Sequence, residues 1–351
     1  MKRVVSAAFC LLVILGATTL VLAKGVTTTL AGAGLQSPSP WRDPSPHEVR
    51  WITVDSSVRL EVLDWGGSGR PLVWLGCYLS AHVHDDVAPK LTNQFRVYGI
   101  TRRGIGASGK PATGYTVQRS VDDVLEVLDA LNLQSSMLVG TSCAGQILTM
   151  FASQHSDRLS GLVYLDGATD PTLAPTEFDP QMPDSTALPR LIKPPVPDYT
   201  SFEALRISEL RDRGFAPPEA ELRQRHVANP DGSVGQSLLS PVIRRAITVD
   251  ARIKPEYSRI RVPVLAIYQT QRPFEEVAAA HAIRNEQERA ALGQAYAATR
   301  AMYTRWQHDL RAAVPTARIV ELPSANPFLF LSNEADVLRE LRAFAATLTS
   351  R

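Results

Sequence analysis

Apolar and polar residues alternate in two segments between residues 49 and 64. Residues 49–54 and 58–64 place apolar side chains at nearly every second position, which is typical of strands with one buried face. Only three residues separate the two segments. The pattern therefore predicts a hairpin that forms the antiparallel edge of a sheet.

Six further segments are short and almost continuously apolar, as in parallel strands that are covered on both faces. Helical spacing of apolar residues occurs in residues 120–131 and 335–348, and residues 274–313 include a long polar, Ala-rich helical stretch. Because strands and helices alternate, we expect an α/β fold with a mostly parallel sheet and helices on both faces. The six predicted strands are residues 72–75, 97–100, 137–139, 162–165, 264–268 and 319–322.

The alternation is interrupted in the middle of the chain. Residues 170–261 begin with a Pro-rich stretch and continue with helical patterns in residues 201–213 and 219–227. We interpret this segment as a lid, or cap, inserted into a core that consists of residues 47–169 and 262–351. A small molecule in a lid-covered pocket is the expected ligand.

The first 46 residues differ from the rest of the chain. Residues 1–23 have a basic start, an apolar middle and a small residue at the end, which is typical of a secretory signal peptide. The apolar run is almost as long as the ~20 residues that a membrane-spanning helix needs, so an uncleaved anchor is the alternative. Residues 24–46 are rich in Gly, Ser, Thr and Pro and predict a flexible tether. We expect an exported protein, periplasmic or secreted, or else one anchored by this segment.

Length and charge exclude some classes of function. The chain has 351 residues, of which 44% are hydrophobic, enough for one large core with an insertion. Removal of Lys2 and Arg3 with the signal peptide leaves 35 of 37 basic side chains, against 35 acidic ones. A neutral chain lacks the basic surface that nucleic-acid binding requires. We expect no nucleic-acid partner, no cofactor and no metal, and a membrane contact only if the N-terminal segment is retained.

The most specific chemical signal is GTSCAG at residues 140–145. This sequence follows a predicted strand and precedes an apolar helical stretch. A serine between small residues at such a turn is held in a sharp bend, from which its hydroxyl can attack a carbonyl carbon. Gly140 and Ala144 are small at positions where a larger side chain would clash with the neighbouring backbone. Ser142 is therefore the candidate nucleophile.

From about Val49 to its end, the chain resembles the α/β-hydrolase superfamily. It looks most like bacterial members that have a GHSxAG elbow and an Asn-His-Tyr/Phe segment followed by LSNEAD. The resemblance implies the α/β-hydrolase fold and a serine hydrolase that acts on small esters or other acyl compounds. It also implies that the backbone N–H groups of Cys77 and Cys143 form the oxyanion hole. The matching sequences are LGC at 75–77, RGIGAS at 103–108, the elbow at 140–145 and LSNEAD at 331–336.

The chain departs from this family at one critical position. Pro327 stands where the family pattern has its catalytic histidine, directly before the well-matched residues 331–336. Proline has no nitrogen that could accept the proton of Ser142, and loss of this base lowers turnover by about a million-fold in a serine hydrolase. We expect impaired catalysis. The alternative is a catalytically degenerate protein that binds a ligand or partner.

The other triad members are less clear from the sequence. His82 and His84 follow the predicted oxyanion loop, so we expect them at the start of a helix near the mouth of the site. His82 is the candidate replacement base, and a surface or capping histidine is the alternative. Asp166, at the end of a predicted strand, is the candidate acid, with a turn cap as the alternative. No histidine follows His308.

Cys77 and Cys143 are the cysteines that remain after signal-peptide removal. Because two amides that hold one oxygen must converge, their Cα atoms could lie within the ~4.4 to 6.8 Å that a disulfide spans. An exported protein permits such a bridge. Two small buried thiols are the alternative, and the sequence favours it, because free cysteine is among the most buried residue types.

Overall fold

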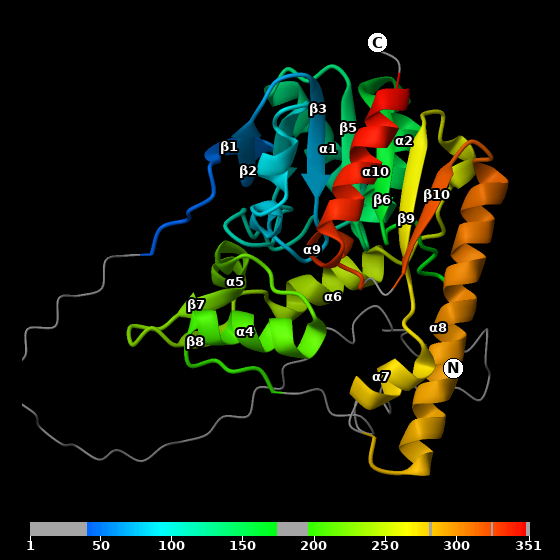
Figure 1. Ribbon diagram of the computed structural model, residues 1–351. Coiled ribbons are helices and arrows are strands. Elements are labelled where there is room, and N and C mark those ends of the chain that lie inside the picture. The colour runs from blue at the N-terminus through cyan, green and yellow to red at the C-terminus, as the bar shows by residue number, and fades with distance from the viewer. Residues whose placement is uncertain (1–40, 174–195, 281–282, 324–325, 349–351) are drawn as a thin grey trace, which may run out of the picture.

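The computed structural model describes residues 41–173, 196–280, 283–323 and 326–348. An eight-stranded sheet in the order β1-β2-β4-β3-β5-β6-β9-β10 lies at its centre (Figure 1). The hairpin β1–β2 is antiparallel, β2 pairs antiparallel with β4, and the other neighbouring pairs are parallel. All eight predicted strands are confirmed. They are β1 (Glu48–Val54), β2 (Val58–Gly66), β3 (Arg70–Leu75), β4 (Phe95–Ile100), β5 (Ser136–Thr141), β6 (Leu159–Leu165), β9 (Val264–Thr270) and β10 (Arg318–Pro323).

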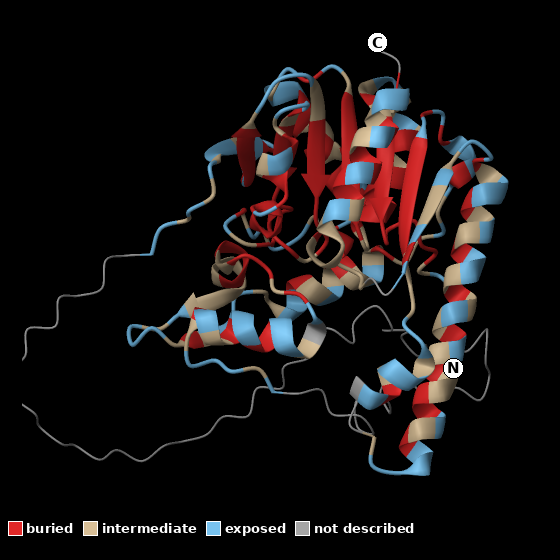
Figure 2. Ribbon diagram, in the orientation of Figure 1, coloured by how far each residue is buried: buried red, intermediate tan, exposed pale blue. Residues whose placement is uncertain are grey.

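Helices cover both faces of this sheet, as the sequence predicts. Val73 and Leu75 pack on one face and Leu72 and Trp74 on the other, because successive side chains of a strand point to opposite sides. The inner strands β3, β4, β5, β6 and β9 are accordingly almost entirely buried, whereas the edge strands β1 and β10 are mostly exposed or half-buried (Figure 2). One face is covered by α1 (Val117–Ala130), α2 (Ala144–Gln154) and α8 (Glu286–Ala313), the other by η2 (Ala81–His84), η3 (Ala88–Leu91) and α10 (Glu334–Thr347).

The chain leaves the sheet between β6 and β9 and forms a cap. Figure 1 shows the cap beneath the carboxyl ends of the parallel strands, with α6 directly under the sheet. The helix predicted over residues 219–227 ends at Arg225, because His226 begins a strand. The described elements of the cap are α4 (Phe202–Arg213), α5 (Glu219–Arg225), the hairpin of β7 (His226–Ala228) and β8 (Val234–Ser237), and α6 (Pro241–Asp250).

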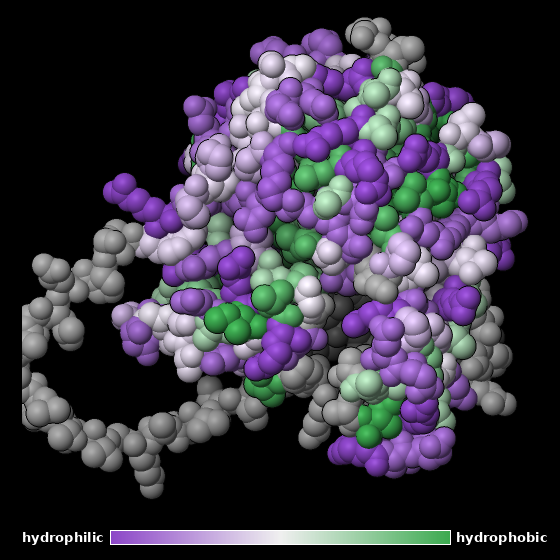
Figure 3. All heavy atoms as spheres, in the orientation of Figure 1, coloured by the Kyte–Doolittle hydropathy of each residue, from purple (hydrophilic) through white to green (hydrophobic). Residues whose placement is uncertain are grey.

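The cap also carries apolar side chains on its outer surface. Ile207 and Leu210 of α4 are more than half exposed, whereas Phe202 and Leu205 of the same helix are buried within the cap. Figure 3 shows apolar spheres gathered over α4. Helix α4 is therefore apolar on two faces. Such a helix has no single apolar stripe along its length, so the spacing of its apolar residues alone predicts its burial poorly.

Residues 41–46 are not a free tether. The Trp65 Nε1–H donates to Ser45 Oγ at 3.2 Å and to Asp85 Oδ1 at 3.1 Å, and His47 Nδ1 lies 3.0 Å from the same Asp85 oxygen. These polar contacts hold the segment before β1 against the core, so the tether prediction is wrong for residues 41–46. The predicted signal peptide and the rest of the tether lie outside the described residues. Within the described part of the chain, no helix is both long and apolar enough to cross a membrane.

Gly145, in the first turn of α2, makes the closest backbone approach among the described glycines. A Cβ at this position would lie 1.8 Å from the carbonyl oxygen of Gly167. The substitution Gly145→Ala should therefore lower the free energy of unfolding by about 3 kcal/mol, since backbone must move to admit it.

Gly293→Ala is the matched control for this prediction. Gly293 is also helical, in α8, but its added Cβ would meet Phe274 at an ordinary 3.6 Å. The free energy of unfolding of this variant should rise by up to about 1 kcal/mol, because alanine favours a helix over glycine by that amount. Urea unfolding of both variants measures the difference. A loss of the same size at both positions would contradict the role of the contact between Gly145 and Gly167.

Candidate active site

Ser142 occupies a strained turn between β5 and α2. Its φ angle is 56°, in the left-handed region, where a residue with a Cβ costs about 1 to 3 kcal/mol. The turn is held from both sides: the Ser142 N–H donates to Leu165 O at 3.3 Å, and the Ser142 carbonyl accepts from the Gly145 N–H at 2.9 Å. This is the backbone geometry of a nucleophile elbow, with a half-buried hydroxyl at its tip.

Small residues around the elbow are required for two different reasons. A Cβ on Gly140 would lie 2.7 Å from Leu148 Cδ1, so the glycine makes room for a side chain of α2. The close backbone contact is made one position after Ala144, between Gly145 and Gly167. Sequence reasoning missed this pair. The Asp166-Gly167 step directly after β6 is the signal that could have indicated it.

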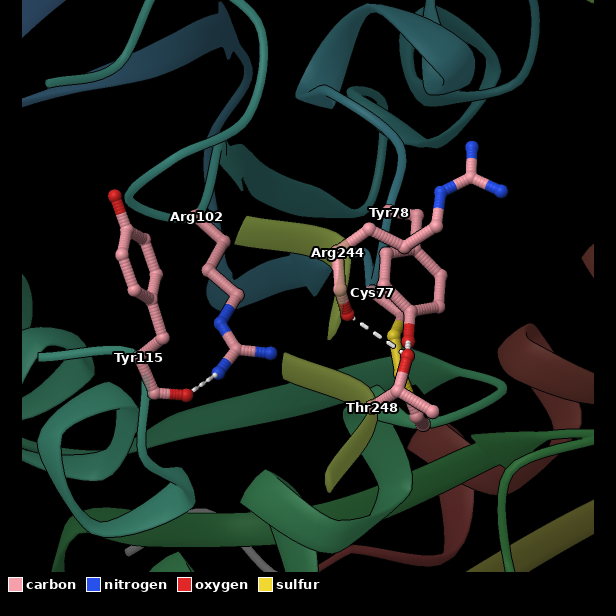
Figure 4. Close-up of a disulfide and its surroundings, with 7 residues drawn as sticks. Cys77, Tyr78, Arg102, Tyr115, Arg244 and Thr248 are labelled. Carbon is pink, nitrogen blue, oxygen red and sulfur yellow. Dashed lines mark hydrogen bonds between the residues drawn. A yellow bond between two sulfur atoms is a disulfide. The ribbon is translucent and has the colours of Figure 1, made fainter. Parts of the chain in front are cut away.

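Cys77 and Cys143 form a disulfide, with their Cα atoms 5.4 Å apart (Figure 4). The alternative of two free thiols, which the sequence favours, is therefore wrong. The bridge forms because the loop after β3 and the residue that precedes α2 converge at the same edge of the sheet. Among the hydrogen bonds of the described residues, none uses the N–H of Cys77 or of Cys143. Both amides are thus available to hold an oxyanion.

The cap covers this bridge. Ile243 and Ile247 of α6 belong to the same apolar cluster as Cys77. Beside the bridge, the hydroxyls of Tyr78 and Thr248 share a hydrogen bond of 2.6 Å, which links the loop after β3 to α6 (Figure 4). The loop after β3, which contains Cys77 and Tyr78, is therefore held by the core on one side and by α6 on the other.

Asp166 follows β6 and is buried, also with a positive φ angle, 51°. Its Oδ2 accepts hydrogen bonds from Tyr303 Oη at 2.7 Å and from Gln269 Nε2 at 3.2 Å. Burial raises the pKa of Asp166 from 3.8 to about 6, although these two partners act in the opposite direction. Among the described residues, no imidazole contacts this carboxylate. The candidate acid is thus in place without a histidine to orient.

The raised pKa of Asp166 leads to a pH-dependent stability. The Asp166 carboxyl group loses its proton near pH 4 in the unfolded chain and near pH 6 in the folded chain. Its contribution to the free energy of unfolding is therefore fully present below pH 4 and is lost as the pH rises through 6. At about 1.4 kcal/mol per pKa unit, the loss is about 3 kcal/mol.

The substitution Asp166→Asn removes the titrating carboxyl group. The free energy of unfolding should then no longer fall between pH 4 and pH 6 because of this residue. Above pH 7 the variant should be more stable than the original chain, and below pH 4 the difference should vanish. Urea unfolding at pH 4, 6 and 8 measures it. A difference between the two proteins that does not change with pH would contradict the raised pKa.

His82 and His84 lie in η2, the short helix that follows the loop of Cys77, so the helix expected there is confirmed; both side chains are buried and do not lie at an open mouth. His82 faces the carboxylates of Asp43, Asp85 and Glu61. Burial alone would lower the pKa of His82, but these three hydrogen-bonding partners outweigh it and raise the pKa to about 12. An imidazole that keeps its proton cannot accept one from a serine, so His82 is no replacement base in this arrangement.

His84 is packed as a core residue. Its ring stacks on Trp74, with centroids 4.5 Å apart, and lies 4.8 Å from the ring of Phe330. Burial lowers its pKa to about 3, so it is neutral at physiological pH. The other described histidines do not contact Ser142 through a hydrogen bond either, and His281 lies outside the described residues.

Pro327 is half-buried in the loop between β10 and α9 (Leu329–Ser332). The backbone of this loop is held by Asn326, whose Oδ1 accepts from the Phe328 N–H at 2.8 Å. The Phe328 ring packs on Phe215 of the cap, with centroids 5.1 Å apart. Residues 326–328 are therefore held by an asparagine turn and by an aromatic contact to the cap. Among the described residues, no hydrogen bond joins the Ser142 hydroxyl to an imidazole.

A small cavity lies where the cap meets the core. Its volume is about 10 Å³, room for about one water molecule. Core and cap contribute to it together, since its lining includes Leu79, Val83 and Phe328 of the core and Phe215 and Pro217 of the cap.

Comparison with known proteins agrees with the fold. Residues 69–190 match the family model described as the alpha/beta hydrolase fold. These residues include the elbow and the loop of Cys77, whereas Pro327 lies outside them. An AB hydrolase superfamily protein of Bacillus subtilis is 33% identical over 107 residues, 30% of this chain and 40% of the relative. A soluble epoxide hydrolase of Corynebacterium is 35% identical over 101 residues, 28% and 35% of the two chains.

A third relative, a bifunctional esterase/perhydrolase of Acinetobacter calcoaceticus, is 27% identical over 133 residues, 37% of this chain and 48% of its own. The chain thus spans less than half the length of each of these relatives. Solved structures agree over more of the chain. The E-2-(acetamidomethylene)succinate hydrolase covers 86% of this chain and 100% of its own, with a TM-score of 0.60 and 18% identity. Taken together, the sheet topology, the family match over residues 69–190 and the solved structures show that this chain has the α/β-hydrolase fold.

Proposed function

We propose that this protein binds a small ester or other acyl compound at Ser142 and hydrolyses it slowly. One observation carries the proposal: the elbow at Ser142 and the unused amides of Cys77 and Cys143 are retained, but Pro327 occupies the loop where a base is needed. The two amides can stabilise the oxyanion of a tetrahedral intermediate. Without an imidazole, the hydroxyl stays a weak nucleophile, and its proton must pass to water.

A labelling experiment tests this proposal. The purified protein is treated with a fluorophosphonate probe, which reacts with nucleophilic serines, and the modified peptide is identified by mass spectrometry. We expect slow labelling at Ser142 that disappears in Ser142→Ala. Labelling as fast as in a serine hydrolase with a complete triad would contradict the loss of the base. A folded protein without any labelling would contradict hydrolysis and leave ligand binding alone.

A catalytically degenerate ligand-binding protein is the second candidate. It is supported by the bridge that ties Cys77 to Cys143 and by α6, which packs over that bridge. Calorimetry with short-chain esters and with the matching carboxylic acids distinguishes the two candidates. Binding of an ester with no release of acid over hours supports the second one.

We also propose that the protein is exported. The bridge between Cys77 and Cys143 supports this, because disulfides persist in oxidising compartments. The basic and apolar residues 1–23 support it independently. Expression of the full chain in a bacterial host, followed by fractionation and N-terminal sequencing, tests it. A protein that stays in the cytoplasm with residues 1–23 attached would contradict export.

A further inference from the structure

Four side chains that commonly bind metals converge outside the candidate active site. Asp43 and His47 belong to the segment before β1, His82 lies in η2, and Asp85 is the residue that ends η2. One potential ligand atom from each lies within 4.8 Å of all the others. The cluster therefore joins two segments that are about forty residues apart in the sequence.

The hydrogen bonds of this cluster do not satisfy all of its atoms. His82 Nδ1 lies 2.9 Å from Asp43 Oδ2 and 3.0 Å from Asp85 Oδ2. One ring nitrogen carries at most one proton, which can point along only one of these directions. Asp43 Oδ2 is buried, and it shares the His82 nitrogen with Asp85, so one of the two carboxylate oxygens has no proton to accept from it. A cation placed between the three atoms would satisfy both oxygens at once.

The surroundings of the cluster resemble the outer shell of a metal site. The other nitrogen of His82, Nε2, lies 3.3 Å from Glu61 Oε1, and Glu61 Oε2 accepts from Thr101 Oγ1 at 2.7 Å. Metal-bound histidines usually pair their second nitrogen with a carboxylate in this way. Asp85 Oδ1 accepts from the Trp65 Nε1–H at 3.1 Å, which leaves Oδ2 of the same carboxylate as the ligand atom.

We propose that Asp43, His47, His82 and Asp85 bind one Zn²⁺ ion. Two imidazoles and two carboxylates form a complete four-ligand set for zinc, and a set without an open position has a structural role. Binding would replace the proton on His82 Nδ1 and attach residues 41–47 to the core. Imidazole ligands favour Zn²⁺ over Mg²⁺ and Ca²⁺. From the sequence alone, no metal is expected. The four side chains come from two separate segments, and their spacing along the chain matches no metal-binding motif.

The affinity of the full chain for zinc tests this proposal. The purified protein is stripped with EDTA, dialysed and titrated with Zn²⁺ at pH 7.5 against a chromophoric chelator. We expect one equivalent to bind and no competition from millimolar Mg²⁺ or Ca²⁺. Asp43→Asn and His47→Gln should each weaken binding at least tenfold. Glu61→Gln should weaken it about 10- to 100-fold, the usual effect of an outer-shell carboxylate.

His308→Gln is the matched control, because His308 is largely exposed on α8 and lies outside the cluster. Its zinc affinity should equal that of the original chain. The absence of saturable binding, or an equal loss in His308→Gln, would overturn the proposal.

Two measurements keep the test decisive if a ligand variant fails to fold. Zn²⁺ should raise the melting temperature of the original chain, and EDTA should reverse the rise. Co²⁺ in place of Zn²⁺ should give the strong visible absorption of a four-coordinate site. A melting temperature that is the same with Zn²⁺ and with EDTA, or a weak six-coordinate Co²⁺ spectrum, would also overturn it.

Discussion

Replacing Pro327→His should raise the hydrolysis rate of a p-nitrophenyl ester by about 100-fold or more, because a positioned general base contributes about 10² to 10⁴ in rate. The structure supports this position for a base. The loop of Pro327 follows β10, whose Leu322 lies opposite Gln269 of β9 in the sheet register, and Gln269 is bonded to Asp166. An imidazole in this loop would therefore enter at the same edge of the sheet as the candidate acid.

The pH profile of the variant provides a second readout. The gained activity should appear as the pH rises through the imidazole pKa, near 6.5 for an unperturbed histidine. Pro327→Ala is the matched control, since it relieves the backbone in the same way without supplying a base. The double variant with Ser142→Ala should lose the gain. If Pro327→His is no faster than Pro327→Ala, the site has eroded beyond the base, and the ligand-binding function is favoured.

Removing the disulfide should lower the free energy of unfolding by about 4 kcal/mol, on the loop-entropy model for a bridge whose cysteines are 66 positions apart. Cys77→Ser, Cys143→Ser and the chemically reduced protein should all show this loss in urea unfolding. The bridge joins the two residues whose amides are the proposed oxyanion donors. Fluorophosphonate labelling of Ser142 should therefore slow as well, since these donors are then no longer tied to one another.

The control for the disulfide experiment is Cys10→Ser. Cys10 belongs to the predicted signal peptide and is not part of the bridge. This variant should unfold like the original chain, and reduction should destabilise it to the same extent. Titration of the denatured, unreduced protein provides an independent check. Reactive thiols at both Cys77 and Cys143 would show that the bridge does not form.

The candidate site thus separates two requirements of serine hydrolysis. The positions of Ser142 and of the Cys77 and Cys143 amides depend on backbone geometry, which the buried strands, α2 and the small residues Gly140 and Gly145 maintain. In the proposed function, proton transfer depends on one side chain, and Pro327 stands where the resemblance places that side chain. A chain can therefore keep the scaffold and the electrostatic part of the mechanism while turnover is strongly reduced.

Local patterns in the sequence were enough to identify the strands, most of the helices and the elbow at Ser142. A strand or helix that is buried on one or both faces has a characteristic spacing of apolar residues, which a short segment already shows. A strained turn needs small residues next to it. That residue 327 is a proline is also a property of the sequence, and a proline side chain cannot accept a proton in any fold.

Only the tertiary structure decided which distant groups meet. It placed Gly145 against Gly167, joined Cys77 to Cys143, and surrounded Asp166 with Tyr303 and Gln269 instead of an imidazole. It also brought the segment before β1 onto η2. Such contacts depend on how elements far apart in the chain cross and pack, and the residues on either side carry no local periodicity that reports their partner.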